Sequence, residues 1–141
     1  TPKMRPLDVI KKSLLSTEAG WVDVDKDTMQ HNHFDNVFSC GDGSSLPTSK
    51  TSAAVRAQVP IMVRNILSAR DDQPLVNYYN GYTSCSIVTG YGRSILAEFD
   101  YDLIPRETLP FDQSTERMGM YILRKDIMPK LYWHGFLKGR F

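Results

Sequence analysis

Two short segments of the sequence contain residue types that could do chemistry. In the first, Gly41-Asp42 ends an apolar run, and Lys50 follows in what we expect to be the first turn of a helix. The free N–H groups and the dipole of a helix start attract anions, and a lysine adds a full positive charge. An aspartate at the end of a strand can also accept a hydrogen bond from a sugar-like hydroxyl. An ordinary Asp-Gly turn before a capped helix would have the same sequence, so both readings stay open.

The second segment is the polar stretch 82–86, which contains Cys85. A thiol at an accessible strand entry can form a reactive thiolate, although a lone cysteine is more often buried and inert. Cys40 ends the apolar run before Gly41 and is expected to be a small core residue. The sequence permits a disulfide between the two cysteines but contains nothing that favours one. It has no CxxC pair, so a structural zinc site is not expected.

Three further side chains, those of His31, His33 and Asp35, could meet on one side of an extended segment and hold a metal ion. Such triplets are usually solvated polar loops, so we expect no metal site there. Neither glycine cluster has the third glycine of a dinucleotide-binding fingerprint, because Leu46 and Ile95 stand where it would fall. A pyrophosphate-binding turn of the Rossmann type is therefore not expected in this chain.

Composition narrows the possible functions. The chain has 141 residues, of which 41% are hydrophobic and 23% charged, as is typical of one globular domain. Its formal net charge of +1 is too small to indicate nucleic acid as a partner. The longest stretch without charge, residues 73–92, is rich in Asn, Thr, Ser and Gly, so no membrane span is expected. Positive charge is concentrated in residues 43–70 and 124–141, which indicates local anion sites.

The elements that would position the first segment follow from hydrophobic spacing. Helical spacing predicts a short helix over residues 6–15, and short apolar runs predict strands over 21–24 and 36–40. A long helix is expected over about 50–69. Its expected N-cap is Thr48 or Ser49, and Pro60 should kink it or mark its first break.

The second half of the chain is expected to contain a hairpin and a helical tail. Residues 73–81 have the composition of a linker, and 87–89 and 95–99 that of two strands joined by Gly90-Tyr91-Gly92. An amphipathic helical tail is expected over about 114–141, its last segment starting at Pro129. The tail interleaves aromatic and basic residues, as interfacial membrane helices do. A C-terminal helix docked on its own core would have the same pattern.

Several motifs in one order resemble those of sulfide:quinone oxidoreductases of the animal mitochondrial type. Asn-Val-Phe-Ser-Cys-Gly-Asp at 36–42 is similar to the closing FAD-binding motif of flavoproteins with two dinucleotide domains. The resemblance covers essentially the whole chain but only the C-terminal part of the family, without its glycine-rich FAD turn and first redox cysteine. The other matching segments are Leu-Pro-Thr-Ser-Lys-Thr at 46–51, Gly-Tyr-Thr-Ser-Cys at 81–85, Leu-Ala-Glu-Phe-Asp-Tyr at 96–101, Pro-Phe-Asp-Gln-Ser at 110–114 and Leu-Tyr-Trp at 131–133.

The resemblance implies roles for particular residues. Asp42 would bond the ribityl chain of FAD, with Gly41 and Thr48 also at the cofactor. Lys50 and the start of its helix would lie near the isoalloxazine, where positive potential stabilises the reduced flavin. Cys85 would be one of two redox cysteines. Sulfide attacks the sulfur bridge between them, a persulfide remains on one cysteine, and two electrons pass to FAD.

The resemblance also implies a fold class and partners. The chain would be an α/β piece in which 1–35 end the second nucleotide-binding-like domain and 36–72 close the FAD-binding domain. Residues 73–141 would form a redox, quinone and membrane-surface region with the amphipathic tail. Electrons would pass from hydrogen sulfide to ubiquinone at the inner mitochondrial membrane, as in a peripheral protein, and the sulfur would go to glutathione or sulfite. The quinone and membrane residues would be Leu131, Tyr132, Trp133, Phe136 and Leu137.

Two alternatives remain. Another quinone-linked flavoprotein, such as a type II NADH dehydrogenase, shares the Gly-Asp motif and the tail but needs no cysteine at position 85. A non-catalytic truncated membrane-surface module would lack the redox half altogether. We expect the 141 residues alone to be inactive and to bind FAD weakly or not at all. Flavin absorbance of the protein from its natural source would separate the non-catalytic module from either enzyme.

Overall fold

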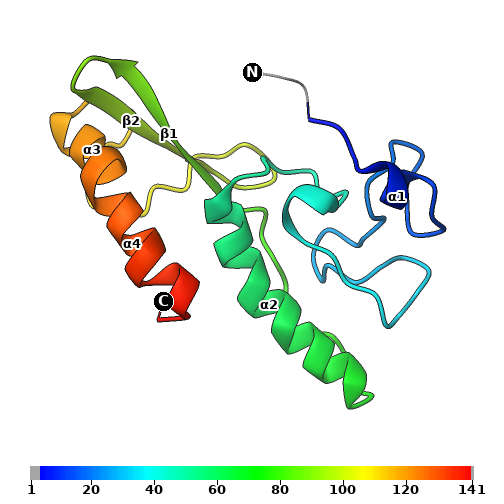
Figure 1. The fold of residues 1–141 in the computed structure, drawn as a ribbon. Coiled ribbons are helices and arrows are strands. Elements are labelled where there is room, and N and C mark those ends of the chain that lie inside the picture. Colours follow the sequence, from blue (N-terminus) through cyan, green and yellow to red (C-terminus); the bar gives the residue numbers. More distant parts are fainter. Residues whose placement is uncertain (1–3, 141) are drawn as a thin grey trace. The chain divides into compact units, whose positions relative to one another are not determined.

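The computed structural model describes residues 4–140 and is of the α/β class, with helices and one two-stranded sheet (Figure 1). Its backbone divides into two compact units. The first comprises Thr1–Thr83 and Phe99–Ile104, and the second comprises Ser84–Glu98 and Pro105–Phe141. The expected α/β class is thus confirmed, while the two-domain flavoprotein fold and its boundaries at 35 and 72 remain predictions.

The first unit contains α1 (Asp8–Lys11), the short 3-10 helix η1 (Gly41–Gly43) and the long helix α2 (Ser52–Arg70). Its hydrophobic core is formed by Val22, Val24, Met29, Leu46 and Tyr79, against which Cys40 and residues of α2 pack.

Most of residues 4–50 is irregular, so one expected helix is shorter than the sequence suggested and two expected strands do not form. The helix expected over 6–15 ends at Lys11, because the Ser13 hydroxyl donates to Ile10 O at 2.7 Å and accepts from Leu15 N. A serine that bonds to nearby backbone groups competes with helical hydrogen bonds. In place of the strands expected over 21–24 and 36–40, the structure has only isolated bridges. These join Val22 with Ser16 and Ser44, Val24 with His31, and Gln30 with Phe38.

Helix α2 confirms the expected long helix but begins two residues later. The Thr51 side chain accepts from Ala54 N at 3.1 Å and is the N-cap, so the expected caps Thr48 and Ser49 were wrong. Thr51 has the extended backbone conformation of an N-cap residue, and its hydroxyl accepts a hydrogen bond from one of the unpaired N–H groups of the first helical turn. The helix continues through Pro60 to Arg70, so no break occurs at the proline.

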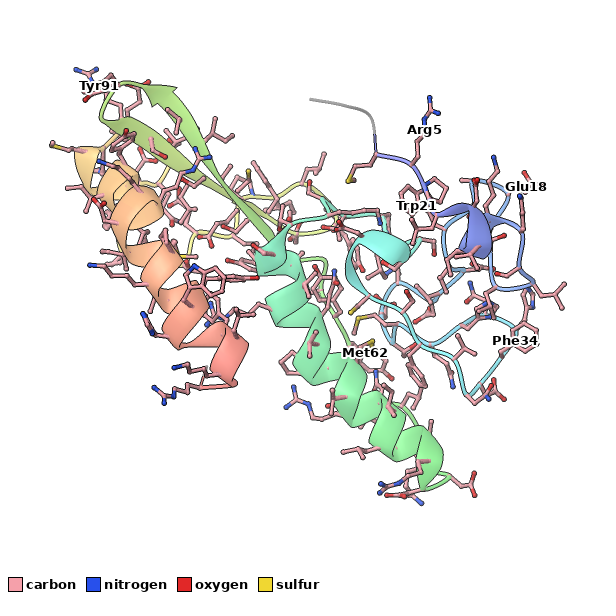
Figure 2. The ribbon with its side chains drawn as sticks, viewed as in Figure 1. Arg5, Glu18, Trp21, Phe34, Met62 and Tyr91 are labelled. Atoms are coloured by element: carbon pink, nitrogen blue, oxygen red, sulfur yellow. The ribbon has the colours of Figure 1, made fainter. Side chains whose placement is uncertain are left out.

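The hairpin expected in the second half is confirmed. Strand β1 (Thr83–Gly90) pairs with β2 (Arg93–Phe99) across the turn Tyr91-Gly92. Gly92 has a φ of +71°, which glycine adopts without strain. Tyr91, at the tip, is fully exposed (Figure 2).

Beside β2, a polar cluster of buried side chains holds residues 105–113. The Glu98 carboxylate, 4% exposed, accepts from Thr108 N and from the Gln113 side-chain amide, each at 2.8 Å. The Leu96 N–H donates to Gln113 O, and Ser94 forms a bridge with Arg117. The segment after the hairpin is therefore tied to β2 by backbone and side-chain bonds together.

The tail is helical from Met118, later than the residue 114 expected from the pattern. It runs through α3 (Met118–Ile122), the π-helical turn η2 (Leu123–Ile127), α4 (Met128–His134) and the 3-10 turn η3 (Phe136–Lys138), the first three forming one rod (Figure 1). Pro129 at the start of α4 explains the π turn, since proline has no N–H and its ring crowds the carbonyl four residues earlier. Phe141 lies outside the described residues. Within 4–140, we find no helix with the length and apolar character needed to span a bilayer.

Candidate functional site

The Gly41–Gly43 turn has a conformation that requires glycine at its first position. Gly41 has a φ of +63°, and a Cβ there would lie 2.9 Å from the Val55 side chain of α2. Its N–H donates to Gln58 Oε1 at 2.8 Å, and its carbonyl accepts from the Ser44 hydroxyl at 2.8 Å. Gln58 is 1% exposed, so this bond is shielded from water. The turn is therefore held directly against α2.

Asp42, at the centre of this turn, has an exposed side chain. Together with Gly43 it lines a cavity of about 350 Å³ whose wall also includes Arg5 and Trp21. The latter two side chains are labelled in Figure 2. Among residues 4–140, the Asp42 carboxylate has no hydrogen bond and no ion pair at contact distance. It is thus free to accept hydrogen bonds from a ligand.

Lys50 lies differently from the expectation that it sits in the first turn of the helix. It precedes α2 by two residues, and its ammonium donates to Ser44 O at 2.5 Å and to Gly41 O at 3.4 Å. The same nitrogen lies 4.8 Å from the centre of the Trp21 ring. Burial lowers the pKa of Lys50, and the nearby Asp42 carboxylate opposes that shift. Lys50 therefore brings positive charge to the turn while its protons are used by backbone carbonyls.

Thr48 is directed toward the chain that precedes β1. Its hydroxyl donates to Gly81 O at 3.0 Å. Gly81 has a φ of +82°, and any Cβ there would overlap the Tyr101 ring. The Thr48 side chain therefore links the loop before α2 to residue 81.

Cys85 is exposed on β1, as the sequence predicted for an accessible strand entry. Cys40 is half-buried and packs against the hydrophobic core, as expected for a small core residue. Burial raises the pKa of the Cys40 thiol, which disfavours its reactive thiolate. Both thiols are free in this structure.

The histidine segment contains one buried ring, that of His31, while His33 and Asp35 are exposed. His31 is 3% exposed, its Nε2 lies 3.2 Å from Leu15 O, and its Nδ1 accepts from His33 N at 3.0 Å. Both ring nitrogens of His31 are thus occupied by backbone groups. Among the described residues, no group of three or more His, Cys, Asp or Glu side chains is arranged to hold a metal ion.

The tail presents much of its apolar surface to solvent. Trp133 is 62% exposed and Leu137 55%, while Leu131 and Phe136 are partly buried. Tyr132 packs edge-on against Trp133 with ring centres 5.4 Å apart. Large apolar side chains in this state are typical of a surface that meets a membrane or another protein.

The predicted site residues fall into two groups. The first unit contains Gly41, Asp42, Thr48 and Lys50 within one loop, and the second contains Cys85 and the tail residues. Their roles at a cofactor, substrate or membrane remain predictions.

Three residues that organise the loop did not emerge from the sequence. Trp21 lies against Lys50, Thr51 caps α2, and Gln58 binds Gly41. Only Gln58 left a signal, as a polar residue on the helix face that also carries the buried Ala54.

The similar curated proteins include three that are called mitochondrial sulfide:quinone oxidoreductase. The chain is 54% identical to that of Mus musculus over 99% of its length, and 52% identical to that of Dictyostelium discoideum over 99%. It is 47% identical to that of Schizosaccharomyces pombe over 94%. The chain spans about a third of these relatives, 30–31% of each. The resemblance seen in the motifs is thereby confirmed.

No protein-family model matches the chain. A structural comparison found a chain of the cryo-EM structure of the Tetrahymena thermophila mitochondrial ATP synthase F1Fo composite tetramer. The match has a TM-score of 0.79, covers 90% of this chain and 31% of the other, and has 23% sequence identity. At that identity the match concerns the fold alone.

Proposed function

We propose that this chain is the C-terminal third of a FAD-dependent sulfide:quinone oxidoreductase. The observation that carries the proposal is an identity of 47–54% over 94–99% of the chain to three proteins of that name. The motifs around Asp42 and Cys85 lie within the matched length. A type II NADH dehydrogenase is not favoured, since all three relatives are named for sulfide oxidation.

The Gly41–Gly43 turn fits one end of a FAD site. The exposed Asp42 carboxylate is an acceptor suited to hydroxyl groups such as those of a ribityl chain, and Gly43 beside it leaves room for a close approach. Lys50 contributes positive charge next to the turn, which favours an anionic reduced flavin. The cavity at Asp42 is about 350 Å³, so these residues would hold only part of the cofactor. FAD, when bound, supplies a two-electron acceptor between the thiols and the quinone.

Cys85 is the proposed catalytic residue, and its exposure on β1 supports that role. Sulfide attacks the sulfur bridge between Cys85 and a second cysteine outside this chain, so that one sulfur–sulfur bond forms as another breaks. The sulfide sulfur then remains as a persulfide until a small acceptor, such as glutathione or sulfite, removes it. Over the cycle, the sulfide sulfur loses two electrons and ubiquinone gains two electrons and two protons. The cysteines end in their starting state.

The tail is proposed to lie at the mitochondrial inner membrane and to border the quinone entrance. The exposed Trp133 and Leu137 and the neighbouring Lys130 and Lys138 support this role, because interfacial helices combine apolar rings with cations. The relatives are named as mitochondrial proteins. A peripheral attachment is consistent with a tail that is amphipathic.

Replacement of Cys85 in the full-length protein tests the proposal. Cys85→Ser is expected to abolish sulfide-dependent quinone reduction while flavin absorbance stays at the wild-type level. Cys40→Ala is the matched control, because Cys40 packs against the core and has no proposed catalytic role. Sulfide-dependent turnover that survives Cys85→Ser would refute the assignment.

A further inference from the structure

The three residues that precede Ser84 and Cys85 are each bonded, through side chains, to the part of the chain around the Gly41–Gly43 turn. Gly81 O accepts from the Thr48 hydroxyl at 3.0 Å. Tyr82 O accepts from the Tyr79 hydroxyl, which also hydrogen-bonds with the side chain of Gln58. Gln58 in turn accepts from Gly41 N. Residues 81 and 82 are therefore connected to the Gly-Asp turn through buried or half-buried polar groups.

The side chain of Thr83, the first residue of β1, makes two hydrogen bonds to the segment at the start of α2. Its hydroxyl donates to Ser49 O at 3.2 Å and lies 3.1 Å from the Thr51 hydroxyl. Because the Thr83 proton goes to Ser49 O, the Thr51 hydroxyl must donate to Thr83 Oγ1 while accepting the capping bond from Ala54 N. Thr83 is 6% exposed, so its hydroxyl lies at the buried end of these bonds.

We propose that Thr83, through Thr51, is a positioning residue for Cys85. The inference rests on the proposed function. Cys85 follows Thr83 by two residues in the same strand, so the backbone position of Thr83 determines where the strand that carries the thiol begins. Thr51 lies one residue after Lys50 and begins the helix that holds Gly41. The hydroxyl pair thus ties Thr83, the residue at which the cysteine strand begins, to the residue that caps α2.

The threonines take no part in the chemistry themselves. In the proposed reaction the sulfide sulfur loses two electrons and stays as a persulfide on a cysteine, and FAD, when bound, would accept those electrons. That transfer depends on the placement of the reacting atoms, and a misplacement of about 1 Å can reduce a rate by on the order of a hundredfold. Loss of the hydroxyl pair should therefore slow electron transfer without abolishing the reaction of sulfide with the sulfur bridge.

Stopped-flow reduction of the flavin by sodium sulfide in the full-length protein tests this. Thr83→Val, which keeps the side-chain shape but removes the hydroxyl, is expected to slow flavin bleaching by about tenfold or more. Thr83→Ser, which keeps the hydroxyl, is expected to restore the rate to within about threefold of wild type. Bound FAD, reduction by dithionite and the persulfide detected by mass spectrometry should stay unchanged in both variants.

Each possible outcome decides the matter. A Thr83→Val protein that bleaches at the wild-type rate, or a Thr83→Ser protein as slow as Thr83→Val, overturns the positioning role. If Thr83→Val does not fold, Thr83→Ala, which removes the hydroxyl without placing a methyl group against Ser49 O, is expected to show the same slow bleaching. A wild-type rate in Thr83→Ala then counts against the proposal. If wild type itself is not bleached by sulfide, the proposed function fails and not merely this inference.

Discussion

The Lys50 ammonium donates to the carbonyl oxygen of Ser44 at 2.5 Å, from across the loop that carries Asp42. A second bond at 3.4 Å reaches Gly41 O, and the Trp21 ring covers the same nitrogen. The lysine thus closes the Gly41–Gly43 turn and at the same time brings its charge close to Asp42. The sequence indicates that Lys50 binds an anion. In the structure, its ammonium holds the backbone of this loop through two hydrogen bonds.

Replacement of Lys50 separates these two contributions. Lys50→Met should lower the free energy of unfolding by about 1–3 kcal/mol, because a charged donor to buried carbonyls is lost. Lys50→Arg keeps the charge, but its planar guanidinium cannot take the place of a compact ammonium, so it should recover only part of the stability. Urea denaturation measures both. The exposed Lys130→Met is the control and should change stability by less than about 0.5 kcal/mol. An equal loss of stability in Lys130→Met would argue that the Lys50 hydrogen bonds contribute nothing specific to folding.

The contact between Gly81 and Tyr101 leads to a second prediction. Gly81→Ala combines a left-handed backbone with overlap of the new Cβ and the Tyr101 ring, so it should cost about 2–5 kcal/mol. Gly92→Ala is the matched control, since Gly92 also has a positive φ but has open space around the Cβ position. Its cost should be only about 1–2 kcal/mol. Thermal unfolding of the two variants checks the difference, and equal losses would show that the tyrosine ring moves aside at little cost.

The sequence predicted the elements that depend on long local patterns. Periodicity predicted the long helix, although not its continuation through Pro60, and turn residues predicted the hairpin at Tyr91. The polar residues around Cys85 indicated its exposure. The region before Lys50 was predicted poorly. Ser13 bonds to nearby backbone groups and ends the first helix early, and residues 21–24 and 36–40 form isolated bridges in place of strands.

The contacts around the Gly-Asp turn show the same limit. The bond from Gly41 to Gln58 joins residues 17 apart, and that between Thr51 and Thr83 joins residues 32 apart. Such pairings depend on how the chain folds back on itself, and the spacing of residues within one element does not predict that. The nature of the turn was therefore predictable, but the residues that hold it were not.

A third prediction concerns acid stability. The Asp25 carboxylate accepts from Thr28 N at 2.7 Å, from the Thr28 hydroxyl at 2.8 Å and from Asp27 N at 3.1 Å. Burial by itself raises the pKa of Asp25, but these bonds outweigh it and place the pKa below the ordinary value of 3.8. Between the two values the unfolded chain binds more protons, so this stabilisation is complete above the ordinary pKa and is lost as the pH falls through the folded one.

Urea midpoints measured between about pH 5 and pH 3 check this. The midpoint of wild type should fall more steeply with acid than that of Asp25→Asn, which cannot gain or lose the proton. Asp35→Asn is the control, because Asp35 is exposed and its carboxylate accepts none of the bonds in this turn. It should follow the wild-type curve. A wild-type slope in Asp25→Asn would mean that other carboxylates cause the acid loss.

The exposed apolar side chains of the tail provide the last prediction. Burial of one such side chain in a membrane interface contributes about 1.5–3 kcal/mol, and about 1.4 kcal/mol corresponds to tenfold in affinity. The double variant Trp133→Ser/Leu137→Ser should therefore bind vesicles that contain anionic phospholipid at least about tenfold more weakly, as measured by co-sedimentation of the full-length protein. Tyr91→Ser is the matched control, since Tyr91 is fully exposed but lies at the hairpin tip, and it should bind like wild type. If the tail variant also binds like wild type, these two side chains do not contribute to membrane binding. Their exposure would then indicate a surface that contacts another protein.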